Sequence, residues 1–178
     1  MLYLAGTVGI LLSVLLSGSI FALSFFRRRP EEVLPITVMG IVAVLYVAGL
    51  LGILAPGFCF LLAMAALLIA VSVFRVLRRR QLRRFLADFF TPGMCIFCGL
   101  FVFLLYMNYG MLAHGWDEFS HWMDCVKAMT ILDSFATDPR SYSTYASYPP
   151  SMALFQYFVE KIYLSLNPDA AFCEWLVY

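Results

Sequence analysis

Residues 58–84 read FCFLLAMAALLIAVSVFRVLRRRQLRR, an apolar run that ends in a cluster of arginines. A helix rises about 1.5 Å per residue, so residues 58–77 are long enough to cross a hydrocarbon core of about 30 Å. Arginine and lysine are enriched on the cytoplasmic side of membrane proteins. This stretch therefore predicts a membrane-spanning helix whose C-terminal end faces the cytoplasm.

The composition of the whole chain extends this interpretation. Of its 178 residues, 63% are hydrophobic, 17% aromatic and 13% charged, and the mean hydropathy is +0.87. Soluble domains carry about 25% charged residues. We therefore expect an all-α fold, a polytopic transmembrane helical bundle with an amphipathic surface helix in its first large external loop. The net charge of +1 says nothing about nucleic acid, because the charges are unevenly placed along the chain. A nucleic-acid patch is the alternative for the arginine run, but membrane anchoring is favoured, so no nucleic-acid partner is expected. The run at 75–84 is expected to anchor an interfacial helix on membrane lipid.

Five apolar stretches are candidate membrane spans. The first lacks a positive leading segment and is too long for a cleavable signal peptide. The last has an apolar length of about 24 Å, and Lys161 near its far end is expected to reach the cytoplasmic interface by snorkelling. Its alternative is an interfacial helix that does not cross. Ala55-Pro56-Gly57 is predicted to be the tight turn between the second and third spans. The predicted spans are residues 2–26, 33–54, 58–77, 93–113 and 151–166.

The positive charges predict which loops face the cytoplasm. Nine of the twelve Lys and Arg residues lie in residues 27–29 and 75–84. With the predicted spans, both segments fall on the same side of the membrane, as the positive-inside rule requires. A multi-pass cell-membrane protein is expected, with the N-terminus and residues 114–150 outside.

The chain is expected to have two parts. Residues 1–92 would be an N-terminal extension of three spans and a cytoplasmic arginine-rich interfacial segment. Residues 93–178 would contain a span (93–113), the external loop (114–150), a span (151–166) and the beginning of a further helix (169–178). Because no polar tail follows, we expect an N-terminal fragment of a longer protein. The five cysteines are scattered and indicate no disulfide framework, and Cys95-x-x-Cys98 is expected to pack as small apolar residues.

The external loop is predicted to contain an amphipathic helix from Glu118 to about Phe135. Apolar residues recur there at spacings of three and four, which is typical of a helix with one apolar face. We expect this helix to lie along the membrane surface with its polar face turned away from the lipid. The apolar positions are Phe119, Trp122, Met123, Val126, Met129 and Leu132.

The polar face of this helix carries the candidate site. Asp117, His121 and Asp124 are spaced at i, i+4 and i+7, so they share one side of the cylinder, and Glu118 is within reach of His121. Two carboxylates and an imidazole can bind a divalent cation. Alternatively, one carboxylate acts as a general base beside His121. The third interpretation is a solvated polar face without chemistry.

Two short motifs resemble the GT-C superfamily of membrane glycosyltransferases, which includes protein mannosyltransferases and aminoarabinose transferases of bacterial envelopes. They are Trp116-Asp117-Glu118-Phe119-Ser120-His121-Trp122 and Tyr148-Pro149-Pro150-Ser151-Met152-Ala153-Leu154, and the resemblance covers about residues 94–178. It implies base-assisted, inverting transfer of a sugar from a polyprenyl-phosphate donor to a glycan, lipid or protein acceptor at the outer face.

The family's catalytic base maps to Asp117, with Glu118 as the adjacent alternative. Candidate substrate contacts are His121, Lys127 and Arg140, which have no secure counterparts in the family, and Tyr148 of the second motif. No cofactor is required by the resemblance, and a divalent metal stays an open alternative.

The chain departs from the family in two ways. Four predicted spans precede the loop, where the family usually has one. The family also needs further spans to form its donor groove, so we expect residues 1–178 to be inactive alone. Two other functions remain open: a transporter or flippase of lipid-linked saccharides, and a non-catalytic membrane scaffold. A charged residue inside a span would favour the transporter, and only Glu160-Lys161 comes near that position.

Overall fold

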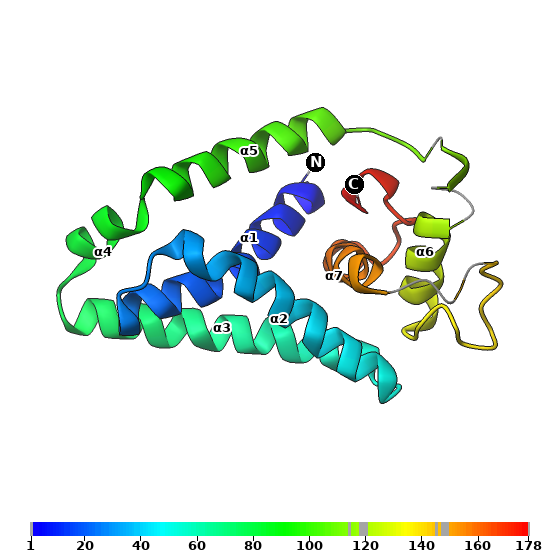
Figure 1. Ribbon diagram of the computed structural model, residues 1–178, viewed down its shortest axis with the longest axis horizontal. Helices are drawn as coiled ribbons and strands as arrows, with labels where there is room; N and C mark the ends of the chain where they lie inside the picture. The colour runs from blue at the N-terminus through cyan, green and yellow to red at the C-terminus, as the bar shows by residue number, and fades with distance from the viewer. Residues whose placement is uncertain (1, 114, 118–120, 145, 147–149, 178) are drawn as a thin grey trace. The chain divides into compact units, whose positions relative to one another are not determined.

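The computed structural model describes residues 2–113, 115–117, 121–144, 146 and 150–177, and every regular element within these ranges is helical (Figure 1). Three helices are long and apolar enough to cross a membrane, which agrees with the expected all-α membrane fold. These helices are α1 (Leu2–Phe26), α2 (Pro30–Leu50) and α3 (Leu54–Arg78). The shorter elements are α4 (Leu82–Phe89), α5 (Pro92–Asn108), α6 (Met123–Leu132), α7 (Ser151–Leu166) and the 3-10 helix η2 (Glu174–Val177).

The predicted fourth span is shorter than expected. Helix α5 ends at Asn108, before Gly110 with its positive φ of 76°. It forms a membrane-length segment only together with α4, and the two helices are bent by 66°. The bend follows from Thr91-Pro92: Thr91 Oγ1 accepts the Met94 N–H at 3.1 Å as a helix cap, and Pro92 occupies the first helical position. A fourth span exists only if this bent pair is counted as one.

The turn between α2 and α3 lies earlier than predicted. The chain reverses at residues 51–53, where Gly52 has a φ of 69°. Ala55-Pro56-Gly57 belongs to the first turn of α3 instead. Proline is tolerated there because the first N–H groups of a helix have no partner within it. Gly52 supplies the left-handed backbone conformation of the turn, whereas Pro56 lies after the turn, in α3.

The described chain forms two compact units. The first unit comprises Met1–Leu11, Ile41–Cys59 and Asn108–Tyr178, and the second comprises Leu12–Gly40 and Phe60–Met107. Helices α1, α2 and α3 each contribute residues to both units. The division at residue 92/93 stays a prediction.

In the second unit, α1 and α2 approach closely through a small residue. Thr37 lies so near Gly18 that a Cβ at this glycine would clash with it. Ser19 Oγ donates a hydrogen bond to the Pro30 carbonyl at 2.8 Å. Small residues allow such approach between membrane helices, so Gly18 lets α1 and α2 pack closely.

In the first unit, α7 lies across other helix ends. Phe158 packs edge-to-face on Phe58 near the start of α3, with ring centroids 5.5 Å apart. At the other end of α7, Leu166 Cδ1 would lie 3.0 Å from a Cβ built on Gly6, near the start of α1. Figure 1 shows α7 nearly end-on, whereas the C-terminal part of α2 runs in the plane of the view.

Among the described helices, α7 is not long and apolar enough to pass as a membrane span alone, although the sequence predicted it as the fifth span. Its 16 residues cover about 24 Å, less than the hydrocarbon core. Lys161 does not extend to an opposite membrane face, because its ammonium pairs at 2.6 Å with Asp133 of the predicted external loop. The non-crossing alternative agrees with this geometry.

The segment after α7 also differs from expectation. Asn167-Pro168-Asp169 forms the predicted turn, but no helix begins at Asp169. Residues 170–173 are irregular, and the next helical element is η2. The Ala113 N–H donates to Glu174 Oε2 at 2.9 Å. This hydrogen bond holds η2 against the residues that follow α5.

Candidate functional site

The candidate base lies just before α6. Asp117 is in a short helical segment with its side chain 79% exposed, whereas the His121 side chain is 11% exposed. Their Oδ1 and Nδ1 atoms are 3.9 Å apart, an i, i+4 pair as the spacing predicts. The structure thus places one accessible carboxylate beside one largely buried imidazole. Glu118 and Tyr148 lie outside the described residues.

This pair can act in proton transfer. An exposed carboxylate can accept a proton from a hydroxyl that approaches from solvent, and a neighbouring imidazole can stabilise its charged form. The 3.9 Å separation between Asp117 Oδ1 and His121 Nδ1 exceeds a direct hydrogen bond, so these two atoms attract each other only when the imidazole is protonated.

The predicted metal set is not assembled within the described part of the chain. No three His, Cys, Asp or Glu side chains come together there in a way that could hold a metal ion. Asp124 lies in the first turn of α6, where a carboxylate interacts favourably with the helix dipole. The geometry brings Asp117 and His121 together, whereas Asp124 stabilises the start of α6.

The predicted cationic substrate contacts differ in availability. Arg140 forms a two-pronged pair with Asp138: its Nε and Nη2 atoms lie 2.9 and 2.8 Å from the two carboxylate oxygens. These hydrogen bonds hold the pKa of Asp138 well below its usual range and raise that of Arg140. Lys127 is exposed on α6. Arg140 is exposed as well, but its guanidinium is already paired with Asp138.

A polar cluster that sequence reasoning missed joins α6 to α7. Asp133, at the C-terminal end of α6 with a φ of 48°, accepts hydrogen bonds on Oδ1 from Tyr157 at 2.8 Å and Lys161 at 2.6 Å. No local pattern links residues separated by 24 and 28 positions. We call Asp133, Tyr157 and Lys161 the α6–α7 clasp. It fixes the end of the helix that follows the candidate base.

Glu160 is the most buried carboxylate among the described residues. Its side chain is 0% exposed, and Oε1 accepts the Cys173 N–H at 2.7 Å. Within the described chain, Oε2 has no hydrogen-bond partner. Burial raises the pKa of Glu160 to about 7, although the Cys173 N–H acts in the opposite direction. The sequence alone indicated only that Glu160 is a charged residue within an expected span.

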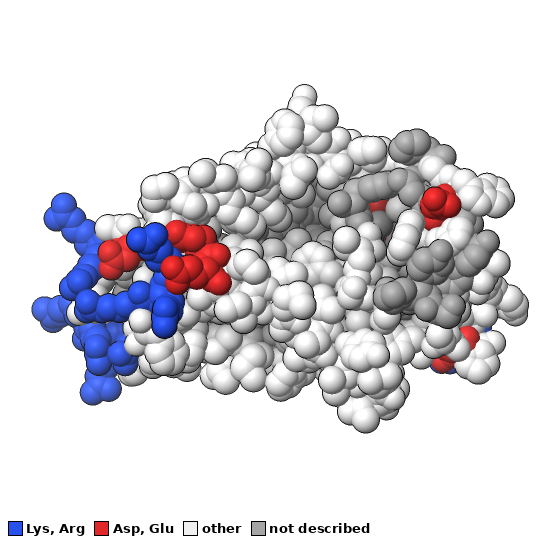
Figure 2. Space-filling model, viewed as in Figure 1, with Lys and Arg blue, Asp and Glu red and all other residues white. Residues whose placement is uncertain are grey.

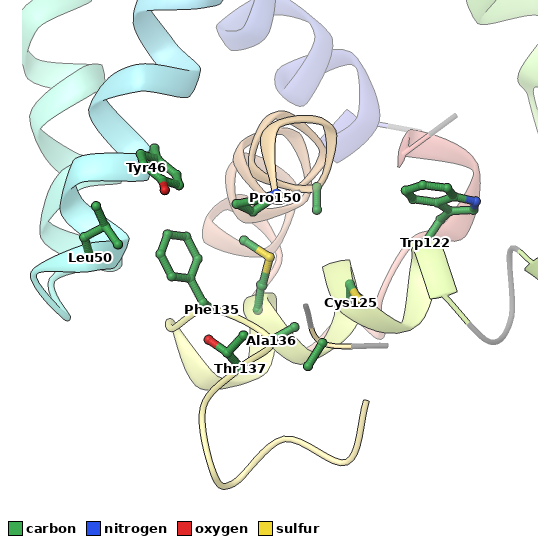
Figure 3. A pocket seen from close by; sticks show the side chains of 11 residues that line it. Tyr46, Leu50, Trp122, Cys125, Phe135, Ala136, Thr137 and Pro150 are labelled. Carbon is green, nitrogen blue, oxygen red and sulfur yellow. The ribbon is translucent and has the colours of Figure 1, made fainter. Parts of the chain in front are cut away.

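An apolar pocket of about 210 Å³ lies beside α6 in the first unit (Figure 3). Trp122, the residue after His121, forms part of its wall, and Phe135 packs against Tyr46 in another part of the wall, with ring centroids 5.8 Å apart. Pockets lined mainly by apolar and aromatic side chains accept apolar ligands. The lining residues are Tyr46, Leu50, Trp122, Cys125, Met129, Phe135, Ala136, Thr137, Ala146, Pro150 and Ala153.

Three comparisons with known proteins gave no match: no protein-family profile, no curated protein and no solved structure resembles the chain at a significant level. The function must therefore be argued from the geometry of its own residues.

Proposed function

We propose that the chain is part of a membrane glycosyltransferase that moves a sugar from a polyprenyl-phosphate donor to an acceptor at the extracytoplasmic face. The observation that carries the proposal is the exposed Asp117 carboxylate beside His121, directly before α6. This is the position of the catalytic base in the GT-C motifs that the sequence resembles. Helix α7 departs from the family pattern, in which a membrane span follows the loop.

The proposed reaction needs one base. Asp117 takes the proton of an acceptor hydroxyl while the hydroxyl oxygen attacks the anomeric carbon of the sugar. The bond from that carbon to the polyprenyl phosphate breaks, and the lipid phosphate leaves with the electron pair. His121 is proposed as a positioning residue beside Asp117. The anomeric configuration inverts because attack and departure occur on opposite faces.

The apolar pocket supports a donor with a hydrocarbon chain. Trp122 belongs both to the turn that carries His121 and to the pocket wall. An isoprenoid chain in this pocket would bring its phosphate towards the turn before α6. Lys127 is exposed on α6, on the opposite side of the helix from the pocket-lining Cys125 and Met129, so it does not contact a ligand within the pocket.

The test replaces the proposed base in the protein as cells produce it. Asp117→Asn should lower sugar transfer from the polyprenyl-linked donor by roughly 10²- to 10⁴-fold, the usual contribution of a general base. Membrane expression should not change. Asp169→Asn, at another exposed acid, is the matched control and should transfer sugar at the normal rate. Normal transfer by Asp117→Asn and by Glu118→Gln would remove the base assignment.

A transporter of lipid-linked saccharides is the second candidate, and Glu160 is the observation that favours it. A fully buried carboxylate with one unpartnered oxygen can take up and release a proton during transport. Under that hypothesis, Glu160→Gln stops movement of a labelled lipid-linked saccharide across vesicles, and Asp117→Asn does not. The glycosyltransferase proposal gives the reverse pattern for sugar transfer. If the protein is a non-catalytic scaffold, neither substitution should change the result of either assay.

A further inference from the structure

The second unit contains an arginine-lined hollow that the proposed sugar chemistry does not use. Figure 2 shows a cluster of basic side chains beside a small acidic patch. The hollow has a volume of about 70 Å³. Four arginines line it, contributed by the residue after α1, by α3 and the turn after it, and by α4. They are Arg27, Arg75, Arg79 and Arg84.

Arg75 is held in place at the wall of this hollow. Its Nε donates to the Ser24 carbonyl at 3.0 Å, and its guanidinium lies 4.3 Å from the centre of the Phe25 ring. Stacking on an aromatic face and one fixed hydrogen bond orient the guanidinium before any ligand arrives. The only acid in the lining is Asp88, which lies 3.7 Å from Arg84. The hollow is therefore strongly positive.

Its size and charge fit one phosphate group. A volume of about 70 Å³ is several times the space that one water molecule needs, which leaves room for a phosphate group. Guanidinium groups bind phosphate oxygens through charge-assisted hydrogen bonds with matching geometry.

A larger hollow adjoins the first and indicates which kind of molecule carries the phosphate. It measures about 410 Å³ and shares Phe25, Arg75 and Arg79 with the smaller hollow. Its other lining includes Val71 and Phe74, which belong to the candidate membrane span α3 and are 39% and 64% exposed. One ligand that fills both spaces needs a phosphate joined to an apolar chain.

Helix α4 places this site at the level of lipid headgroups. None of its residues is buried, and it carries Leu82 and Leu86 as well as Arg83 and Arg84. Short helices with arginines on one face and leucines on another lie in the membrane interface. Basic pockets at the ends of membrane helices are recognised sites for anionic lipid headgroups.

We propose that the two adjoining hollows form a binding site for one anionic phospholipid. The phosphodiester is bound by Arg75, Arg79 and Arg84 in the smaller hollow. An acyl chain runs along Phe74 in the larger hollow. This site is independent of the sugar chemistry proposed for Asp117.

The full chain purified in detergent allows a direct test by native mass spectrometry. The probes are phosphatidylglycerol, phosphatidylcholine with the same acyl chains, and inorganic phosphate. Wild-type protein should retain phosphatidylglycerol in preference to phosphatidylcholine. Arg79→Gln/Arg84→Gln should weaken its retention by roughly thirty-fold, given the usual contribution of each arginine near an anionic headgroup.

A matched control removes the same charge outside the hollows. Arg80→Gln/Arg83→Gln also alters one residue of the turn and one of α4, yet neither residue lines the site. It should retain the lipid within about threefold of wild type. Equal losses in the two double variants would overturn the proposal, because they would show a general charge effect.

A second variant separates a lipid from a free anion. Phe74→Ala keeps every arginine and should weaken phosphatidylglycerol retention without altering circular dichroism. Inorganic phosphate should not displace the lipid. Displacement by phosphate alone, or unchanged lipid retention by Phe74→Ala, would contradict a site that holds both phosphate and chain.

Discussion

At the scale of single residues, three carboxylates of the first unit have three different environments. Asp117 is exposed beside an imidazole, and Asp133 is paired in the α6–α7 clasp. Glu160 is buried, and one of its oxygens has no partner among the residues that the structure describes. The first can meet a substrate from solvent. The second holds two helices together, and the third responds to pH because burial disfavours its charged form.

The buried Glu160 predicts that stability falls as pH rises. Its folded pKa of about 7 lies above the ordinary value of 4.5, so the fold favours the protonated form. The corresponding stability is complete below about pH 4.5 and is lost as pH rises through about 7, by about 3 kcal/mol at most. The Cys173 thiol, whose pKa is raised to about 11, does not titrate in this window.

Thermal unfolding of the protein in detergent measures this effect. Wild type should unfold at a lower temperature at about pH 8 than at about pH 5, and Glu160→Gln should remove most of the difference. An equal pH dependence in both proteins would assign the effect to other groups.

At the scale of elements, the approach of α1 to α2 gives a prediction with an internal control. Gly18 has no room for a side chain because Thr37 fills the space, whereas nothing lies within 4 Å of a Cβ at Gly40. Gly18→Val should destabilise the protein by about 1–3 kcal/mol through overpacking. Gly40→Val changes the same residue type in a neighbouring helix, and its unfolding temperature should stay close to wild type. Equal unfolding temperatures for the two variants would contradict close helix packing at Gly18.

The orientation of α7 gives a second prediction at this scale. Because α7 lies across helix ends in the first unit, Ser165 near its end should face the same side of the membrane as Tyr142 in the loop. Both side chains are exposed. In a cysteine-free background, Ser165→Cys and Tyr142→Cys should react equally with a membrane-impermeant maleimide on intact cells. Protection of Ser165→Cys alone would restore α7 as a membrane span.

The sequence predicts elements better than their arrangement. Apolar length located α1, α2 and α3, and the periodicity around Val126 and Met129, both buried, located α6. Hydropathy alone could not show that α7 lies across other helices, because a buried interfacial helix and a span have similar composition. Asp133 and Lys161 could not be paired from sequence, because their contact depends on how α6 and α7 pack.

The candidate site could also be predicted from the sequence only in part. The i, i+4 spacing of Asp117 and His121 was visible in the sequence, because such residues are neighbours on one helix. The pairing of Arg140 with Asp138, the burial of Glu160 and the apolar pocket depend on the folded chain. Glu118 and Tyr148 lie outside the described residues, so their roles stay predictions.

At the scale of the whole molecule, charge divides between the two units. The second unit contains all nine arginines of residues 27–29 and 75–84, and the first contains Asp117 and the remaining cations. The account rests on the proposal that these two groups face opposite sides of the membrane. Sugar transfer outside the cell and phospholipid binding at the arginine end both fit that topology.

Cysteine labelling tests this central claim most directly. With the five native cysteines replaced by alanine, Tyr142→Cys and Gln81→Cys place single thiols at exposed positions in the loop and beside the arginine run. We predict that a membrane-impermeant maleimide labels Tyr142→Cys on intact cells and Gln81→Cys only after permeabilisation. Labelling of Gln81→Cys on intact cells, or protection of Tyr142→Cys, would contradict the account.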